Sequence, residues 1–139
     1  MNTTWTCPTC KRLFKKEKQT HSCKLFPVEH HFKNRSDEIK SLYDELLERI
    51  EKEVGDYHIE AVSCCIHLDK GAFTFLAVYQ MKDKVRMHIS FDHEVDHPRI
   101  VASSQISKTL YKHRVEIKEE NEIDKELISW IKEAYTLKD

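Results

Sequence analysis

Near the start of the chain, four side chains have the types and the spacing of a zinc site. Cys7 and Cys10 are separated by two residues, and a histidine and a third cysteine follow as His21 and Cys23. Zinc takes four soft or borderline ligands in a tetrahedron, and this set supplies all four. Because four protein ligands leave no position for water, the pattern predicts a structural zinc ion rather than a catalytic one.

A metal crosslink is the physical means by which such a stretch could hold one shape. A segment of about 20 residues cannot bury enough apolar surface to fold alone. Once the metal closes the loop, Trp5, Leu13 and Phe14 would pack beside it as a small core.

The identity of the last ligands stays open. His21 and Cys23 are two residues apart and do not share a helix face, so one of them must lie at a helix end or in a turn. His30 and His31 are alternative fourth ligands. The competing interpretation is a disordered basic tail with unrelated cysteines. A redox C-x-x-C pair is disfavoured because no thioredoxin-like strand and helix surround it.

The charge of the chain divides it into two parts. Residues 1–35 hold eight Lys or Arg against two Glu, a net charge of +6, and the remaining residues carry −7. We therefore expect a zinc-binding, knuckle-like element at 1–33 and an α+β domain at 34–139. The basic side chains of the element that could contact phosphates are Lys11, Arg12, Lys15, Lys16 and Lys18.

Hydrophobic periodicity predicts the fold of the larger part. Residues 36–55 have apolar side chains at spacings of three and four, with Ser36 as N-cap, and residues 121–138 have a second helical pattern with Asn121 as cap. Four strands are expected at 57–68, 72–81, 84–91 and 110–118, and residues 92–107 read as loop. The predicted architecture is an antiparallel four-stranded sheet covered by the N- and C-terminal helices.

Alternation within the strands predicts which side chains leave the core. In residues 84–91, Arg86 and His88 point away from the apolar face, and Lys112 and Arg114 of the last strand could join them on the outer face. They form either a modest basic surface or a solvated one. His113 shares a face with apolar neighbours and reads as a core histidine. Outside the zinc element, the candidate site residues are Arg86 and His88 on the outer face and, in addition, His113.

Two further patterns have simple interpretations. Cys64 and Cys65 are expected in a strand, with their side chains on opposite faces as buried thiols. His93 to His97 spells H-E-x-x-H, but the metalloprotease signature requires a helix. Pro98 disfavours helical geometry at His97, so a charged, exposed loop is the expected structure.

No apolar run approaches the roughly 20 residues needed to cross a bilayer. The first residues lack a basic region followed by an apolar block, so no secretion signal is expected. We expect a cytoplasmic protein with reduced thiols.

Several stretches in order resemble a bacterial family, the domain of unknown function 5655: TWTCPTC, THSC, HPRI, LYKHRVEI and ELISWIKEAY. The family's core is similar to the alpha-beta sheets of YjbR-like proteins, small domains often supposed to bind DNA. The resemblance implies that Cys7, Cys10, His21 and Cys23 are a metal set and that His113 is a family position, and it implies no reaction.

The sequence thus favours a zinc-stabilised binding module that contacts DNA or RNA through its basic N-terminal element. The alternative is an adaptor whose basic element docks on an acidic protein partner or on its own domain. An enzyme is less favoured, because no pair of polar residues on the sheet has a spacing that demands chemistry. The absence of a glycine-rich phosphate loop also counts against nucleotide enzymes.

Overall fold

The computed structural model describes residues 5–8, 11, 13–14, 26–62 and 64–137. It contains a two-stranded sheet of β1 (Trp5–Thr6) and β2 (Leu13–Phe14) and a separate six-stranded sheet with two α-helices. In the described part, no helix combines the length and the apolar character needed to cross a membrane.

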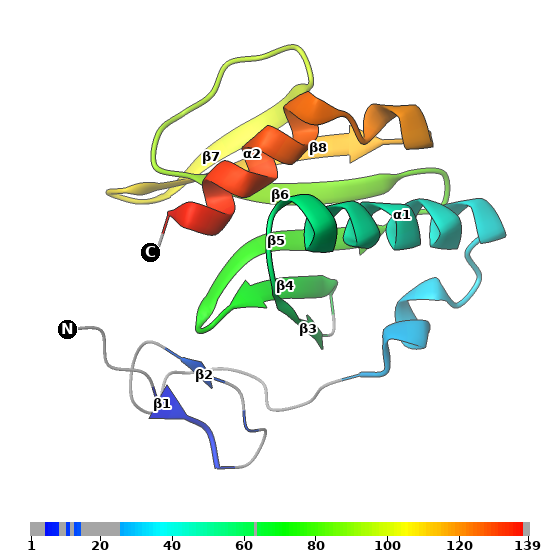
Figure 1. Ribbon diagram of the computed structural model, residues 1–139, viewed down its shortest axis with the longest axis horizontal. Helices are drawn as coiled ribbons and strands as arrows, with labels where there is room; N and C mark the ends of the chain where they lie inside the picture. Colours follow the sequence, from blue (N-terminus) through cyan, green and yellow to red (C-terminus); the bar gives the residue numbers. More distant parts are fainter. Residues whose placement is uncertain (1–4, 9–10, 12, 15–25, 63, 138–139) are drawn as a thin grey trace.

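The six-stranded sheet is antiparallel throughout, with the order β3-β4-β5-β6-β8-β7. The strands β3 to β6 form a meander. Strand β7 lies at the edge of the sheet, outside β8, so the segment that connects β6 to β7 passes over one end of β8 (Figure 1). The strands are β3 (His58–Ala61), β4 (Ile66–Lys70), β5 (Phe73–Gln80), β6 (Val85–Phe91), β7 (Ile100–Ser107) and β8 (Leu110–Ile117).

The prediction of a four-stranded sheet was wrong in two places. Residues 57–68 are a hairpin and not one strand, because the backbone N–H of Val62 donates to the carbonyl of Cys65 at 2.9 Å and closes a tight turn. The predicted loop 92–107 contains β7, which pairs with β8 along its length. The α+β class holds, but the sheet has six strands and a second, two-stranded sheet precedes it.

Both helices cover the same face of the large sheet (Figure 1). The prediction for α1 (Asp37–Glu53) is confirmed, including the Ser36 cap, whose hydroxyl accepts from the N–H of Ile39 at 3.3 Å. The predicted cap of α2 (Lys125–Thr136) was wrong. Asp124 caps it, and Asn121 lies in a short 3-10 helix, η2 (Glu120–Glu122).

The core lies between the helices and the sheet. Val85, Met87, Ile89 and Phe91 of β6 are fully buried there, as their alternation predicts. Outside this layer, η1 (Val28–Phe32) adds Val28 and Phe32 to the edge of the same core.

Gly55 ends the first helix at a position that no other residue fits well. Its φ is +152°, and a Cβ there would lie 2.7 Å from the hydroxyl oxygen of Tyr135. That hydroxyl donates to the carbonyl of Asp56 at 2.8 Å, so the last turn of α2 is tied to the segment after α1.

Replacing buried Ile131 of α2 by alanine should lower the free energy of unfolding by about 2–5 kcal/mol, because the side chain is fully buried and leaves a cavity. The matched change Ile106→Ala, at a side chain 54% exposed on β7, should cost at most about 1 kcal/mol. Urea denaturation of both variants measures the difference. Equal losses would contradict the assignment of the core to the helix-covered face.

Candidate functional site

The outer face of the large sheet, away from the helices, brings basic side chains together. In the pairing of β6 with β8, His88 lies opposite Arg114 and Ser90 opposite Lys112. Residues opposite each other in an antiparallel pair project to the same face, and these alternate with the fully buried side chains of β6. The prediction that Arg86, His88, Lys112 and Arg114 share one face is confirmed.

A cavity of about 210 Å³ lies over this part of the sheet, and we call it the basic cavity. The edge strand β7 contributes one wall, because Ala102 pairs with Arg114 and Ser104 with Lys112. Among the described residues, none that lines the cavity carries a carboxylate. Its lining residues are His88, Ala102, Ser103, Ser104, Lys112 and Arg114.

The two cations of the basic cavity, Lys112 and Arg114, differ from the nearby cations Lys84 and Arg86 in whether a carboxylate neutralises their charge. On the same face, Glu116 accepts from Arg86 Nε at 2.8 Å and lies 3.5 Å from Lys84 Nζ. Within the described ranges, neither Lys112 nor Arg114 forms an ion pair, and the buried Nε of Arg114 has no hydrogen-bond partner. Because a buried donor is normally satisfied, this nitrogen marks a place where an acceptor would be favourable.

His88 is held neutral beside these cations. Burial, and then the positive charges of Lys112, Arg114 and Arg86, lower its pKa to about 4. Its ring lies against that of Tyr79, with 4.7 Å between centroids. At neutral pH His88 therefore offers one donor and one acceptor without adding charge.

His113, the third candidate outside the zinc element, does not lie on this face with Arg86 and His88. It pairs with Ile89, projects into the core and is fully buried, as its interpretation as a core histidine requires. The backbone N–H of Val95 donates to its Nε2 at 2.9 Å. Burial lowers the pKa of His113, so the neutral ring can accept this bond and hold the loop between β6 and β7.

The two histidines of the H-E-x-x-H sequence do not face one another as the metalloprotease signature requires. Residues 92–99 are irregular, and its two histidines have different partners. His93 interacts with Asp92 at 2.6 Å and lies 3.9 Å from Glu133, whereas His97 Nε2 lies 3.1 Å from Glu126. The prediction that this stretch is an exposed loop and not a helix is confirmed.

Arg99, which sequence reasoning did not select, anchors the same loop to α2. Its Nη1 donates to both carboxylate oxygens of Asp124, at 2.9 and 3.1 Å, and to Glu126 at 3.2 Å. Its Nη2 donates to the carbonyl of Glu122 at 2.8 Å. The only signal in the sequence was the HPRI stretch, whose arginine therefore has a structural role here.

The two adjacent cysteines are also placed differently from the prediction. Cys64 and Cys65 lie in the turn between β3 and β4, and their Sγ atoms are 3.1 Å apart rather than on opposite faces. Cys65 is fully buried and Cys64 is exposed. Burial first, and then its neighbour Cys64, raise the pKa of the Cys65 thiol to about 12, so without a bound metal this thiol stays protonated at neutral pH.

Of the predicted zinc ligands, only Cys7 lies within the described residues. It is 4% exposed and directly follows β1, which pairs with β2 so that Trp5 lies opposite Phe14. The N–H of Lys11 donates to the carbonyl of Cys7 at 2.8 Å, and Lys11 has a φ of +65°. The predicted residues outside the described part are Cys10, His21, Cys23, Arg12, Lys15, Lys16 and Lys18.

The described geometry is compatible with a metal at this hairpin. The N–H of Lys11 bonds to the carbonyl of Cys7, and the buried Cys7 has the soft ligand atom that zinc requires. The alternative ligands have other roles. His31 Nε2 donates to the carbonyl of Val62 at 2.8 Å, and His30 stacks on Phe26 with 4.6 Å between ring centroids.

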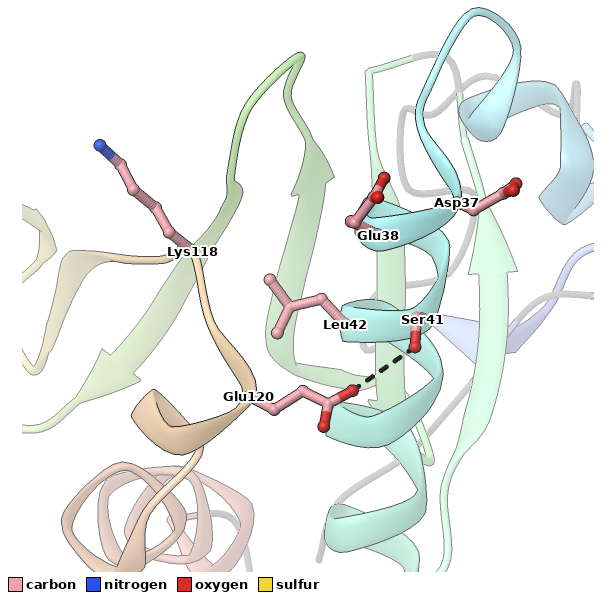
Figure 2. A pocket seen from close by; sticks show the side chains of 6 residues that line it. All are labelled: Asp37, Glu38, Ser41, Leu42, Lys118 and Glu120. Atoms are coloured by element: carbon pink, nitrogen blue, oxygen red, sulfur yellow. Dashed lines mark hydrogen bonds between the residues drawn. The ribbon is translucent and has the colours of Figure 1, made fainter.

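A larger cleft of about 380 Å³ lies on the helical side, between the start of α1 and η2. Figure 2 shows carboxylates around it and Lys118 pointing away from α1. Ser41 donates to Glu120 at 3.5 Å across the cleft, a long contact. Asp37 and Glu38 lie in the first turn of α1, where negative charge interacts favourably with the helix dipole, so these two carboxylates have a structural explanation. The lining residues are Asp37, Glu38, Ser41, Leu42, Lys118 and Glu120.

A family model described as a domain of unknown function (DUF5655) matches residues 28–138. The chain belongs to the DUF5655 family. No curated protein and no solved structure matches it. The match begins at the first residue of η1, so the DUF5655 region includes both helices, the six-stranded sheet and the basic cavity. Cys7 and the two-stranded sheet precede it.

His113 should make the stability of this DUF5655 chain depend on pH. A histidine in the unfolded chain has a pKa of about 6.5, and the folded value is lower, so the unfolded state binds more protons below that pH. The free energy of unfolding should therefore fall as the pH is lowered from 7 to 5. His113→Gln, whose side-chain oxygen can still accept from Val95, should weaken this dependence.

Urea denaturation at the two pH values measures the change, with exposed His30→Gln as the matched control. An unchanged pH dependence in His113→Gln, or an equal reduction in the control, would show that His113 does not contribute as described.

Proposed function

We propose that this protein is a nucleic-acid-binding module in which the basic cavity receives a backbone phosphate and the basic N-terminal element adds further phosphate contacts. The observation that carries the proposal is the basic cavity itself. It is lined by Lys112 and Arg114, and in the described part of the chain neither is paired with a carboxylate and no acidic residue lies in the cavity wall.

The chemistry of the lining suits a phosphate group. A guanidinium presents several N–H donors in a planar fork, and a lysine adds a point charge, so Arg114 and Lys112 match phosphate oxygens. The hydroxyl of Ser104, which pairs with Lys112 and shares its face, is a further donor. At about 210 Å³ the cavity is smaller than the roughly 300–1,000 Å³ typical of sites for whole small-molecule ligands. One phosphate of a longer chain fits that size better than a complete cofactor.

The distribution of charge favours a polymer that contacts the outer face and avoids the helices. Helix α1 contains seven acidic and three basic residues, so its exposed side repels a polyanion. The N-terminal residues 1–35 carry +6, and Lys11 is exposed. We also propose that the fold of this chain is similar to that of YjbR-like domains. The supposed DNA binding of those domains agrees with the function proposed here.

Zinc has a supporting part in the proposal. Cys7, Cys10, His21 and Cys23 would hold one ion with all four positions filled, and the ion would order the hairpin that presents Lys11 and the lysines after it. The burial of Cys7 and the hydrogen bond from the N–H of Lys11 to its carbonyl support this arrangement. In this proposal the zinc ion only stabilises the structure, and the basic side chains make the contacts with phosphate. These contacts give affinity and require no reaction.

Binding of labelled single-stranded and duplex DNA and RNA, followed by fluorescence anisotropy at several salt concentrations, tests the proposal. The double variant Lys112→Gln/Arg114→Gln should weaken binding and reduce the slope of log K against log salt by about 1.4–1.8, the value for two lost phosphate contacts. Lys52→Gln/Lys132→Gln removes the same charge from exposed helical positions and should change little.

A second variant separates the two surfaces. Lys15→Glu/Lys16→Glu should weaken binding further if the N-terminal element contributes. No nucleic-acid binding at low salt, together with salt-sensitive binding to an acidic peptide, would replace the proposal by the adaptor function. Equal effects of the cavity variant and its control would remove the basic cavity from the interface.

Elemental analysis of the purified protein should find one zinc ion per chain, because the four-ligand site is saturated and tight. Cys10→Ser should lose this ion and lower the stability of the N-terminal element. Retention of the zinc by Cys10→Ser would contradict the ligand set. The exposed His30→Gln is the control, and it would lose zinc only if His30 were a ligand.

A further inference from the structure

We propose that Cys64, Cys65 and His67 form a second metal site, open on one side, for a thiophilic divalent ion such as Zn²⁺ or Co²⁺. This inference is independent of the nucleic-acid proposal, since it concerns another end of the sheet. One ligand atom from each residue lies within 4.8 Å of the others.

The hairpin turn brings the two sulfur atoms together. Ala61 pairs with Ile66, and the bond from Val62 to Cys65 closes the four residues between the strands. In this turn both sulfur atoms lie on one side, 3.1 Å apart, which two neighbouring residues of an extended strand could not achieve. The backbone therefore supplies a paired-thiol arrangement before any metal is bound.

His67 completes the cluster through the two-residue period of β4. It follows Cys65 by two positions and projects to the same face, and Glu60 of β3 lies directly opposite it. Around a tetrahedral zinc ion with Zn–S of about 2.3 Å and Zn–N of about 2.0–2.1 Å, ligand atoms lie about 3.5–3.8 Å apart. The three observed atoms approach this spacing without movement of the strands.

The burial of the residues sets the character of the site. Cys65 is fully buried, His67 is half-buried and Cys64 is exposed in the turn. The exposed Cys64 side chain can rotate to widen the distance between the sulfur atoms, and the solvent side is left for a water or another ligand. With three protein ligands the site should bind metal more weakly than a site with four, so it fills from added metal.

Two other clusters of possible ligands lack these features. In His58, Glu60 and Asp69, the carboxylate of Asp69 already accepts from the Thr74 hydroxyl at 2.6 Å. The cluster of Asp92, His93 and Glu133 is fully exposed and has no sulfur ligand. The turn cluster alone among these combines two thiols, an imidazole and a buried member.

The experiment adds Co²⁺ to the reduced, purified protein and follows the thiolate-to-cobalt charge-transfer absorption. We expect one equivalent beyond the metal that the protein already carries. Cys64→Ser, a small change at an exposed position, should weaken this binding at least tenfold and remove most of the band. His67→Gln should weaken it as well. Circular dichroism checks that each variant is folded.

Cys10→Ser is the control, because it removes a ligand of the N-terminal site and leaves the turn unchanged. It should retain the additional band. The proposal is overturned if no additional thiolate–cobalt band appears, if Cys64→Ser leaves the band unchanged, or if Cys10→Ser alone abolishes it. A thiol assay showing that Cys64 and Cys65 form a disulfide in the reduced preparation would overturn it as well.

Discussion

The pairing register of β6 with β8 is the constraint on which both the core and the outer face depend. With His88 opposite Arg114, Ile89 is opposite His113, so one register places the cations outside and the apolar side chains inside. A slip of one residue in β8 would turn Arg114 and Lys112 toward the helices and expose Val115 and Ile117. The hydrophobic layer under α1 and α2 therefore holds the basic cavity in place, although it contributes no residue to its lining.

The position of β7 adds a second constraint. Because β7 lies beyond β8, residues 92–99 must pass over the end of the sheet, where backbone groups need partners. His113 accepts from Val95, and Arg99 ties the end of the loop to the start of α2. These two side chains place β7 beside β8, and only then do Ser103 and Ser104 line the cavity. The loop that spells a catalytic motif thus serves to position a strand.

Periodicity was sufficient where a segment has one buried face. The alternation in residues 84–91 predicted the outward direction of Arg86 and His88, and the spacing in residues 36–55 predicted α1 and its cap. It failed where that signal is absent. The turn at residues 62–65 contains no glycine, proline or asparagine, and β7 is exposed along nearly its whole length, so neither has a pattern to detect. The proximity of Cys64 and Cys65 depends on that turn and could not be predicted without it. Arg99 was missed because its partners are 23 to 27 residues away in sequence.

The net charge of the chain is only −1, but a ligand is affected by how the charges are distributed over the two sides of the sheet. The acidic residues of α1 and the cations of the basic cavity lie on opposite sides of one sheet, so their fields do not cancel at short range. At physiological salt the Debye length is about 8 Å, less than the separation of about 10 Å between packed layers. A polyanion approaching the outer face therefore meets Lys112 and Arg114 with the acidic helix largely screened. The same strand order separates the thiols of the β3–β4 turn from the basic cavity by several strands, so the two proposed sites share no residue.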